Sequence, residues 1–180
     1  MAFLITCAGS KKPIIFNNLS DIENLSFNNA LLNKRVELLE LTGINLDWSR
    51  TLPAWELYSG RRSKMYPQVL AANWNKQCAD VKILSALFGW ISHTDLIPTY
   101  DLSMSNRAGV PAQPIWRFWL NSGLLNQFVT RDDVDLLSVD YRKAVNGNRP
   151  LIAKIPEARF TDYGVQKGRW LNSRLNNLIR

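Results

Sequence analysis

Short apolar runs alternate along this chain with longer segments in which apolar residues recur at helical spacing. Runs bounded by turn residues and rich in β-branched and aromatic side chains predict buried strands. We expect strands at residues 2–7, 81–84, 134–139 and 151–155. We expect helices at residues 28–41, 62–79, 115–129 and 167–180. The alternation predicts an α/β fold in which helices flank a mixed central sheet.

The length of the chain fits one domain spanning residues 1–180. A chain of 180 residues, of which 46% are hydrophobic, can bury one sizeable core. We find no internal repeat and no low-complexity segment, and the polar stretches 18–29 and 146–148 are expected to be connectors. Residues 90–113 carry few regular signals and are expected to form a long irregular loop, which in a compact domain is commonly functional.

Positive charge is the strongest compositional signal. Lys and Arg outnumber Asp and Glu by 22 to 15, which gives a formal net charge of +7 and favours a polyanionic partner. The basic residues cluster at Lys11 and Lys12, at 61–64, and in the tail at Lys167, Arg169, Arg174 and Arg180. The aromatic residues Tyr58, Tyr66, Tyr163 and Trp170 lie between them. This combination suits phosphate contacts and base stacking, although a basic surface that merely keeps the protein soluble is the alternative.

The two cysteines and the start of the chain indicate the cellular compartment in which the protein is expected. Cys7 and Cys78 lie in apolar contexts, so we expect buried free thiols and a reducing environment. No apolar run is long enough to span a bilayer, and no basic segment precedes the short apolar stretch at the start of the chain. We therefore expect a cytoplasmic protein with no signal peptide and no membrane partner.

The sequence lacks the motifs of several common nucleotide-binding and metal-binding sites. The chain has no Walker-type phosphate loop, no paired-glycine dinucleotide fingerprint after the first strand and no Cys/His spacing for zinc. His93 is the only histidine. We expect no metal site and no cofactor.

The strongest candidate site combines residues 83–90 with residues 97–101. A buried strand here delivers polar groups to its carboxyl end, where ligands bind in open α/β sheets. Pro98 can hold Tyr100 and Asp101 in fixed orientations beside Ser85. Alternatives remain for each polar residue: Asp101 as a turn or cap residue, Ser85 as a satisfied strand-end hydroxyl, and His93 as an ordinary loop histidine instead of a proton-transfer group.

Four segments of the chain form a distinctive series: Leu4–Lys12 (LITCAGSKK), Ala54–Gly60 (AWELYSG), Ile83–Gly89 (ILSALFG) and Ile97–Asp101 (IPTYD). Taken together in this order, they resemble the YaaA-like superfamily. They match a Cys-Ser/Gly-x-x-Lys start, a Tyr-x-Gly middle and a Leu-Ser-Ala-x-x-Gly-Leu strand, and the resemblance covers about residues 3–105. Two departures are that Trp90 replaces a common leucine and that no counterpart is found for the tryptophans Trp116, Trp119 and Trp170.

The resemblance implies association with nucleic acid and, from relatives that look like DNA-modification or base-excision proteins, a reaction at a nucleobase. The first hypothesis is therefore a DNA glycosylase for a modified base, with defence against phages as a candidate setting. In this hypothesis Asp101 stabilises the oxocarbenium-like sugar, and His93 is a second catalytic candidate. The substrate is DNA, either single-stranded or a duplex with a flipped base. The expected substrate-binding residues are Ser10, Lys11, Lys12, Tyr58, Ser85, Trp90 and Tyr100. The expected phosphate-binding residues are Arg61, Arg62 and Lys64.

Two other classes of function remain open. The basic turns and the aromatic tail also suffice for a DNA-binding protein without enzymatic activity, in which Asp101 is only a cap. A nucleoside or nucleotide transferase that acts on free substrate would use the same pocket but would bind long duplexes weakly.

Overall fold

A mixed four-stranded sheet forms the centre of the molecule in the computed structural model, which describes residues 1–76, 80–162 and 164–178. Its strands lie in the order β4 (Gly89–Ser92), β3 (Val81–Ser85), β1 (Phe3–Thr6) and β8 (Val134–Asp135). β1 is parallel to both β3 and β8, whereas β4 pairs antiparallel with β3. The carboxyl ends of the three parallel strands therefore meet at one edge of the sheet.

Among the described residues, two small ribbons and six α-helices surround this sheet. The ribbons pair β2 (Thr51–Pro53) with β5 (Leu96–Pro98) and β6 (Arg107–Ala108) with β7 (Gln113–Pro114). The α-helices are α1 (Asn28–Thr42), α2 (Ala54–Leu57), α3 (Ala71–Trp74), α4 (Ile115–Ser122), α5 (Val139–Asn146) and α6 (Val165–Asn176). Three short 3-10 helices are η1 (Ile22–Asn24), η2 (Tyr66–Gln68) and η3 (Leu125–Phe128).

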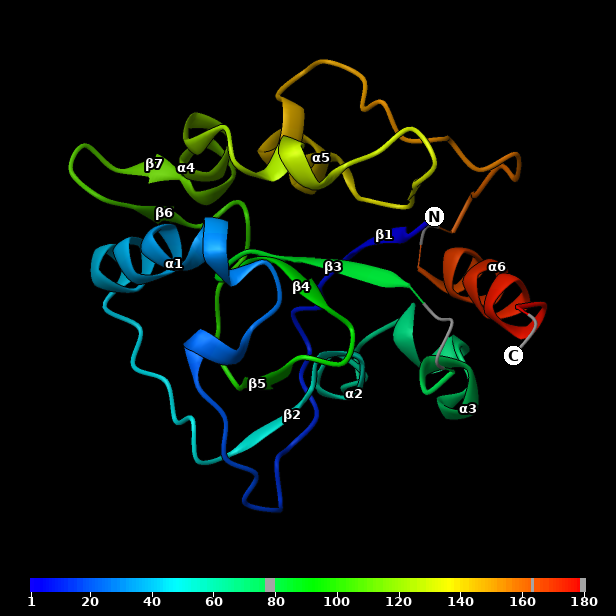
Figure 1. Cartoon of the computed structure of the whole chain (residues 1–180), viewed down its shortest axis with the longest axis horizontal. Helices are drawn as coiled ribbons and strands as arrows, with labels where there is room; N and C mark the ends of the chain where they lie inside the picture. Colours follow the sequence, from blue (N-terminus) through cyan, green and yellow to red (C-terminus); the bar gives the residue numbers. More distant parts are fainter. Residues whose placement is uncertain (77–79, 163, 179–180) are drawn as a thin grey trace.

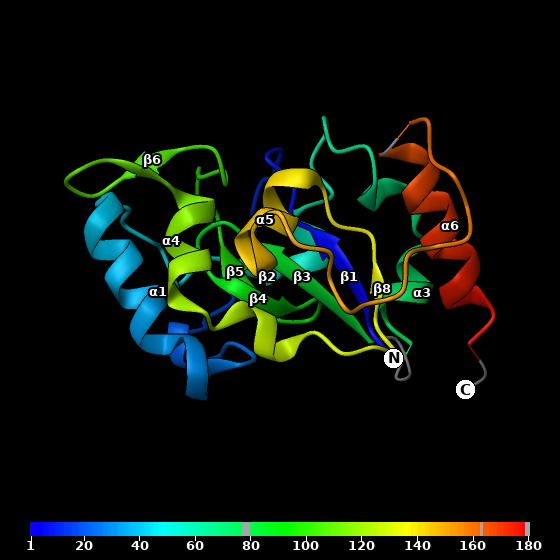
Figure 2. The same cartoon turned by 90° about the horizontal axis from the view of Figure 1, so that it is seen from above.

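The elements form layers on both sides of the sheet. Figure 1 shows α4 and α5 on one side and α2 with the β2–β5 ribbon on the other. Figure 2 shows α1 at one end of the molecule and α3 with α6 at the opposite end. None of the helices within the described residues combines the length and the apolar character needed to cross a membrane.

The architecture confirms the expected α/β fold with a mixed central sheet. β1 and β8 lie within the apolar runs at 2–7 and 134–139, and β3 covers the run at 81–84 and continues to Ser85. α1 follows the segment predicted at 28–41 and ends at Gly43, whose φ of +65° places it in the left-handed region that glycine adopts readily.

The helix predicted over 62–79 is wrong for the residues that the structure describes. This segment instead forms η2 and the single turn of α3, separated by the extended residues Val69 and Leu70. The cause is packing against α6: a Cβ on Gly168 would lie 2.3 Å from the carbonyl oxygen of Met65, and Asn172 accepts a hydrogen bond from the Leu70 amide at 2.9 Å. Residues 77–79, including Cys78, lie outside the described part.

The stretch 90–113 is more regular than expected because it contains β4, β5 and β6. A tight turn returns the chain from β3 into β4. Ser85 Oγ accepts hydrogen bonds there from the amides of Leu87 and Phe88, and Gly89 has a φ of +65°. The turn brings Trp90 and Ile91 into the sheet, where both are fully buried.

Three further boundaries differ from the sequence prediction. The segment 115–129, predicted as one helix, forms two: α4 ends before Gly123, whose φ is +67°, and η3 follows. The expected strand 134–139 is shorter, because α5 begins at Val139. The expected strand 151–155 is reduced to an isolated bridge between Lys154 and Val134.

Candidate functional site

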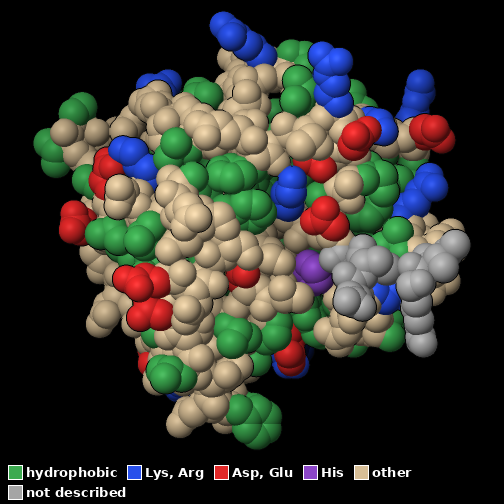
Figure 3. Space-filling model, in the orientation of Figure 1, with side chains coloured by type: hydrophobic (Ala, Val, Ile, Leu, Met, Phe, Trp, Pro, Cys, Tyr) green, Lys and Arg blue, Asp and Glu red, His purple; other side chains and the backbone are tan. Residues whose placement is uncertain are grey.

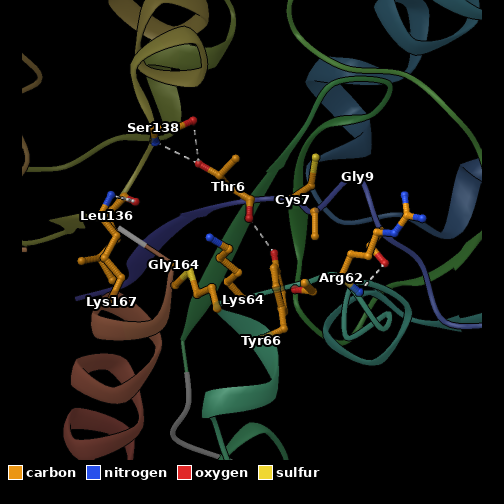
Figure 4. Close-up of a pocket in the computed structure, with 14 residues that line it drawn as sticks. Thr6, Cys7, Gly9, Arg62, Lys64, Tyr66, Leu136, Ser138, Gly164 and Lys167 are labelled. Atoms are coloured by element: carbon orange, nitrogen blue, oxygen red, sulfur yellow. Dashed lines mark hydrogen bonds between the residues drawn. The ribbon is translucent and has the colours of Figure 1, made fainter. Parts of the chain in front are cut away.

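The carboxyl ends of β1 and β8 open onto a pocket of about 290 Å³. Three chain segments besides β8 form its walls: the β1 end, the turn before η2, and the start of α6. The lining residues are Thr6, Cys7, Ala8, Gly9, Ser10, Arg62, Ser63, Lys64, Met65, Tyr66, Leu136, Ser138, Gly164 and Lys167. Figure 4 shows Lys64 and Lys167 on one side of Tyr66 and Arg62 on the other.

Basic side chains dominate the charge of this pocket. Arg62 and Lys64 are exposed, and within the described residues neither side chain has an acidic partner. Lys167 is buried, and its amine donates to the carbonyl oxygens of Leu136 at 2.7 Å and Leu137 at 3.2 Å. Burial lowers the pKa of Lys167, and the nearby charge of Arg142 lowers it further. The pocket is therefore suited to an anionic ligand.

The two basic turns predicted from the sequence lie against each other. Ser10 Oγ accepts a hydrogen bond from the Arg62 amide at 3.0 Å. Gly60 packs so closely on the backbone of Lys11 that a Cβ at position 60 would lie 2.5 Å from the Lys11 carbonyl carbon. The backbone amide of Lys12 donates a hydrogen bond to the carbonyl oxygen of Leu57 at 2.7 Å, which fixes the backbone of the turn. The structure thus brings Ser10, Lys11 and Arg62 together, as the first hypothesis expected of neighbouring site residues.

A chain of buried hydroxyls lies behind the pocket. The hydroxyls of Tyr58 and Tyr100 are hydrogen-bonded at 2.6 Å, and Tyr100 is hydrogen-bonded to Ser85 Oγ at 2.8 Å. Burial raises the pKa of both tyrosines well above the ordinary value, so the phenols keep their protons. Three predicted site residues from separate segments, Tyr58, Ser85 and Tyr100, therefore meet in one network.

Lys11 joins this network to the pocket. Its Nζ lies 4.5 Å from the centre of the Tyr100 ring and 5.8 Å from that of Tyr58, and donates to the carbonyl oxygen of Gly9 at 3.2 Å. Burial lowers the pKa of Lys11, while the charges of Cys7 and Asp101 act in the opposite direction. Since Gly9 lines the pocket, the Lys11 amine lies next to the pocket wall, whereas Lys11 and Asp101 are not themselves among the lining residues.

Asp101 is exposed and makes no hydrogen bond within the described part of the chain. The capping position in the following turn belongs to Asn106, whose Oδ1 accepts from the Ser103 amide at 2.6 Å. The alternative that Asp101 is a structural cap therefore has no hydrogen bond to support it. Its carboxylate is available to a ligand.

His93 and Trp90 lie away from this cluster. The ring nitrogens of His93 face the backbone carbonyl oxygens of Val81, at 3.3 Å, and Trp74, at 3.0 Å. Burial lowers the pKa of His93. Trp90 is fully buried, and its indole donates to the carbonyl oxygen of Leu125 at 2.9 Å. Trp90 therefore has no exposed face on which a base could stack.

The remaining predicted residues, Lys12 and Arg61, are both exposed. Lys12 forms an ion pair with Glu56 at 2.5 Å, which reduces its availability to a ligand. Among residues 1–76, 80–162 and 164–178, no group of three His, Cys, Asp or Glu side chains is arranged to hold a metal ion.

Two pocket residues, Cys7 and Tyr66, have roles that the sequence reasoning missed. Cys7 was interpreted only as a packed thiol, but it lines the pocket and its sulfur lies 3.1 Å from the Tyr141 hydroxyl. Tyr66 donates its hydroxyl proton to the carbonyl oxygen of Thr6 at 2.8 Å. The position of Cys7 directly after β1 was a sequence signal that could have placed it at the site. Tyr66 had no such signal, because the sequence predicts a long helix over 62–79.

The family described as peroxide stress protein YaaA matches residues 14–172 of the chain. Among curated proteins, none matches. The family match begins after the Lys11 turn and continues through β8 and most of α6, so the similarity extends well beyond residue 105, where the sequence resemblance was expected to fade. Because this match spans most of the sequence, the chain belongs to the peroxide stress protein YaaA family.

Proposed function

We propose that the protein binds DNA through the basic turns around the pocket and hydrolyses the N-glycosidic bond of an extruded, modified nucleotide. The observation that carries this proposal is a pocket that holds Arg62 and Lys64, two cations without acidic partners in the described chain. Its wall residue Gly9 accepts a hydrogen bond from the Lys11 amine, which lies over the Tyr100 ring. Burial lowers the pKa of that amine, and the charge of Asp101 acts in the opposite direction.

The size and charge of the pocket support a nucleotide ligand. A volume of about 290 Å³ lies near the lower end of the range for small-molecule pockets and suits one nucleotide unit better than an extended polymer. Arg62 and Lys64 can neutralise the phosphates that flank an extruded nucleotide. Met65 and Tyr66 supply apolar surface to the pocket wall. Residues around the pocket therefore match the separate parts of such a ligand.

Asp101 is assigned the chemical step. Cleavage of an N-glycosidic bond develops positive charge on the sugar, and a nearby carboxylate stabilises that charge or orients the attacking water. Asp101 has an exposed carboxylate with no hydrogen bond in the described structure, so no internal contact must break before it acts. The buried phenol of Tyr100 and the backbone that follows Pro98 hold the residue in place.

The experiment measures free base released from modified and unmodified DNA by mass spectrometry, together with DNA binding by gel shift. Asp101→Asn should retain DNA binding and lose base release, because the amide removes the negative charge while preserving shape. Asp132→Asn is the matched control, since Asp132 is exposed and pairs only with Lys154 at the opposite edge of the sheet. Unchanged base release by Asp101→Asn would contradict the assignment.

The same measurements separate the other classes of function. A binding protein without enzymatic activity shifts DNA but releases no base from any substrate. A transferase that acts on free nucleosides or nucleotides fails to shift long duplexes at moderate salt. Burial favours the binding protein over the glycosylase in one respect, because it removes from a flipped base all three aromatic side chains expected to contact it, Tyr58, Trp90 and Tyr100.

A further inference from the structure

Lys11 differs from the other lysine of its turn. The Lys12 amine is paired with the Glu56 carboxylate, whereas the Lys11 amine contacts only a neutral carbonyl oxygen and two aromatic rings among the described residues. Its side chain is partly buried. An amine held without a carboxylate partner in a partly desolvated site has the surroundings of a nucleophilic lysine.

The electrostatic setting supports this reading of Lys11. Burial lowers the pKa of the amine, which increases the fraction of the neutral, nucleophilic form at a given pH. The charges of Cys7 and Asp101 partly offset this effect. The same carboxylate, Asp101, can accept a proton from a substrate bound next to the amine.

The backbone fixes where the amine can reach. Gly60 packs directly on the backbone of Lys11, and the Lys12 amide is hydrogen-bonded to Leu57. The amine is hydrogen-bonded to the carbonyl oxygen of Gly9, which lines the pocket. The amine of Lys11 therefore lies next to the pocket wall, although Lys11 itself does not line the pocket.

We propose that Lys11 is the nucleophile of a second reaction in the same site, the cleavage of DNA at an abasic deoxyribose. This step rests on the proposed function in one respect: an abasic sugar is the product of base removal. The substrate class is DNA carrying a C1′ aldehyde, and the reaction needs neither metal nor redox cofactor.

The chemistry balances as follows. The Lys11 Nζ adds to the C1′ aldehyde carbon, and loss of one water forms the imine. The Asp101 carboxylate removes a proton from C2′, the electron pair of that C–H bond forms the C2′–C3′ double bond, and the C3′–O bond breaks to release the phosphate of the 3′ strand. Water then hydrolyses the imine, which regenerates the amine and leaves an unsaturated aldehyde on the other strand end.

The test uses the full-length protein and a duplex with one preformed abasic site, in the presence of sodium borohydride. The borohydride reduces the imine to a stable secondary amine, so a covalent protein–DNA adduct is expected on a denaturing gel. Peptide mapping of the wild-type adduct by mass spectrometry should locate the modification on Lys11. This measurement needs no variant and so does not depend on whether a substitution disturbs folding.

Variants provide a second test of the assignment of Lys11. Lys11→Gln should lose the adduct while its thermal unfolding is retained. Lys34→Gln is a matched control, because Lys34 also lies over an aromatic ring, 5.6 Å from the centre of Phe118, but on α1. An adduct mapped to another amine, or equal trapping by Lys11→Gln, would overturn the assignment of Lys11.

The outcomes distinguish this inference from the proposed function. Trapping on preformed abasic DNA without base release from any modified DNA supports the lyase step and overturns the glycosylase. Base release without trapping overturns the lyase step alone. A wild-type protein that neither binds nor traps the abasic duplex overturns both.

Discussion

At the level of single residues, burial separates the polar side chains near the sheet edge into two kinds. Tyr58, Ser85 and Tyr100 are buried and satisfy one another, so they hold the site in shape. Arg62 and Lys64 are exposed and have no acidic partner in the described structure, so they can bind a ligand. Buried polar groups of the first kind are costly to leave without partners, which makes them poor candidates for direct contact with substrate.

His93 belongs to the first kind, and it predicts a pH dependence of stability. Burial lowers its pKa in the folded state, so below the ordinary pKa of about 6.5 the unfolded chain binds a proton that the folded chain does not. The free energy of unfolding should therefore fall as the pH decreases below about 6.5 and level off below the lowered pKa. Urea unfolding measured across this range checks the prediction.

The control is His93→Gln, which removes the only histidine of the chain. The half-buried carboxyl of Asp95 has a raised pKa and contributes in the opposite direction in both proteins, so the difference between their pH profiles reports His93 together with its interaction with Asp95. Profiles that run parallel would show that His93 is not held neutral by the fold.

The convergence of Lys11, Ser85 and Tyr100 was predictable from the sequence, and the burial of Trp90 was not. A strand end followed by a proline-held loop indicates where polar side chains gather, because parallel strands share one carboxyl edge. Trp90 was assigned to a loop because β4 has only four residues and no clear alternation. Its burial depends on pairing with β3, which local sequence does not encode.

At the level of elements, α6 determines the conformation of the segment before α3. Gly168 permits a close approach of α6 to Met65 and Gln68. The sequence of 62–79 has helical periodicity, yet a continuous helix there would occupy the space that α6 takes. Tertiary packing therefore overrides local preference in this segment.

The substitution Gly168→Ala tests this packing. Alanine is normally the better helix former by about 1 kcal/mol, but a Cβ here would lie 2.3 Å from the Met65 carbonyl oxygen and 2.8 Å from the Gln68 Cβ. We expect a net loss of about 1–3 kcal/mol in the free energy of unfolding, measured in urea. Arg169→Ala, at an exposed position of the same helix, should change it by less than about 0.5 kcal/mol. Stabilisation by Gly168→Ala would show that the contact relaxes easily.

At the level of the whole molecule, the net charge of +7 is spread over several surfaces. Figure 3 shows Lys and Arg side chains over much of the upper and right-hand part of one face, interleaved with hydrophobic ones. Composition alone therefore predicted a basic protein, but not which basic residues surround the pocket. Arg62 belongs to the pocket because its turn places it beside Ser10, which the composition does not reveal.

Salt dependence can show which of these charges contact DNA. Replacing Arg62 and Lys64 together by glutamine should reduce the slope of log K against log salt by about 2, since each phosphate contact on a duplex contributes about 0.9. Arg131→Gln with Lys154→Gln removes the same charge near the amino ends of the strands and should leave the slope unchanged. Equal changes in both variants would place the DNA elsewhere.

Gly60 gives the site an unusual sensitivity to mutation. No side chain fits at this position, because any Cβ would meet three backbone atoms of Lys11 within 2.7 Å, and backbone atoms cannot rotate aside. A substitution at position 60 would therefore displace the lysine without altering any functional group of the site. In a random library, loss of activity on substitution at position 60 would report the required position of the Lys11 backbone.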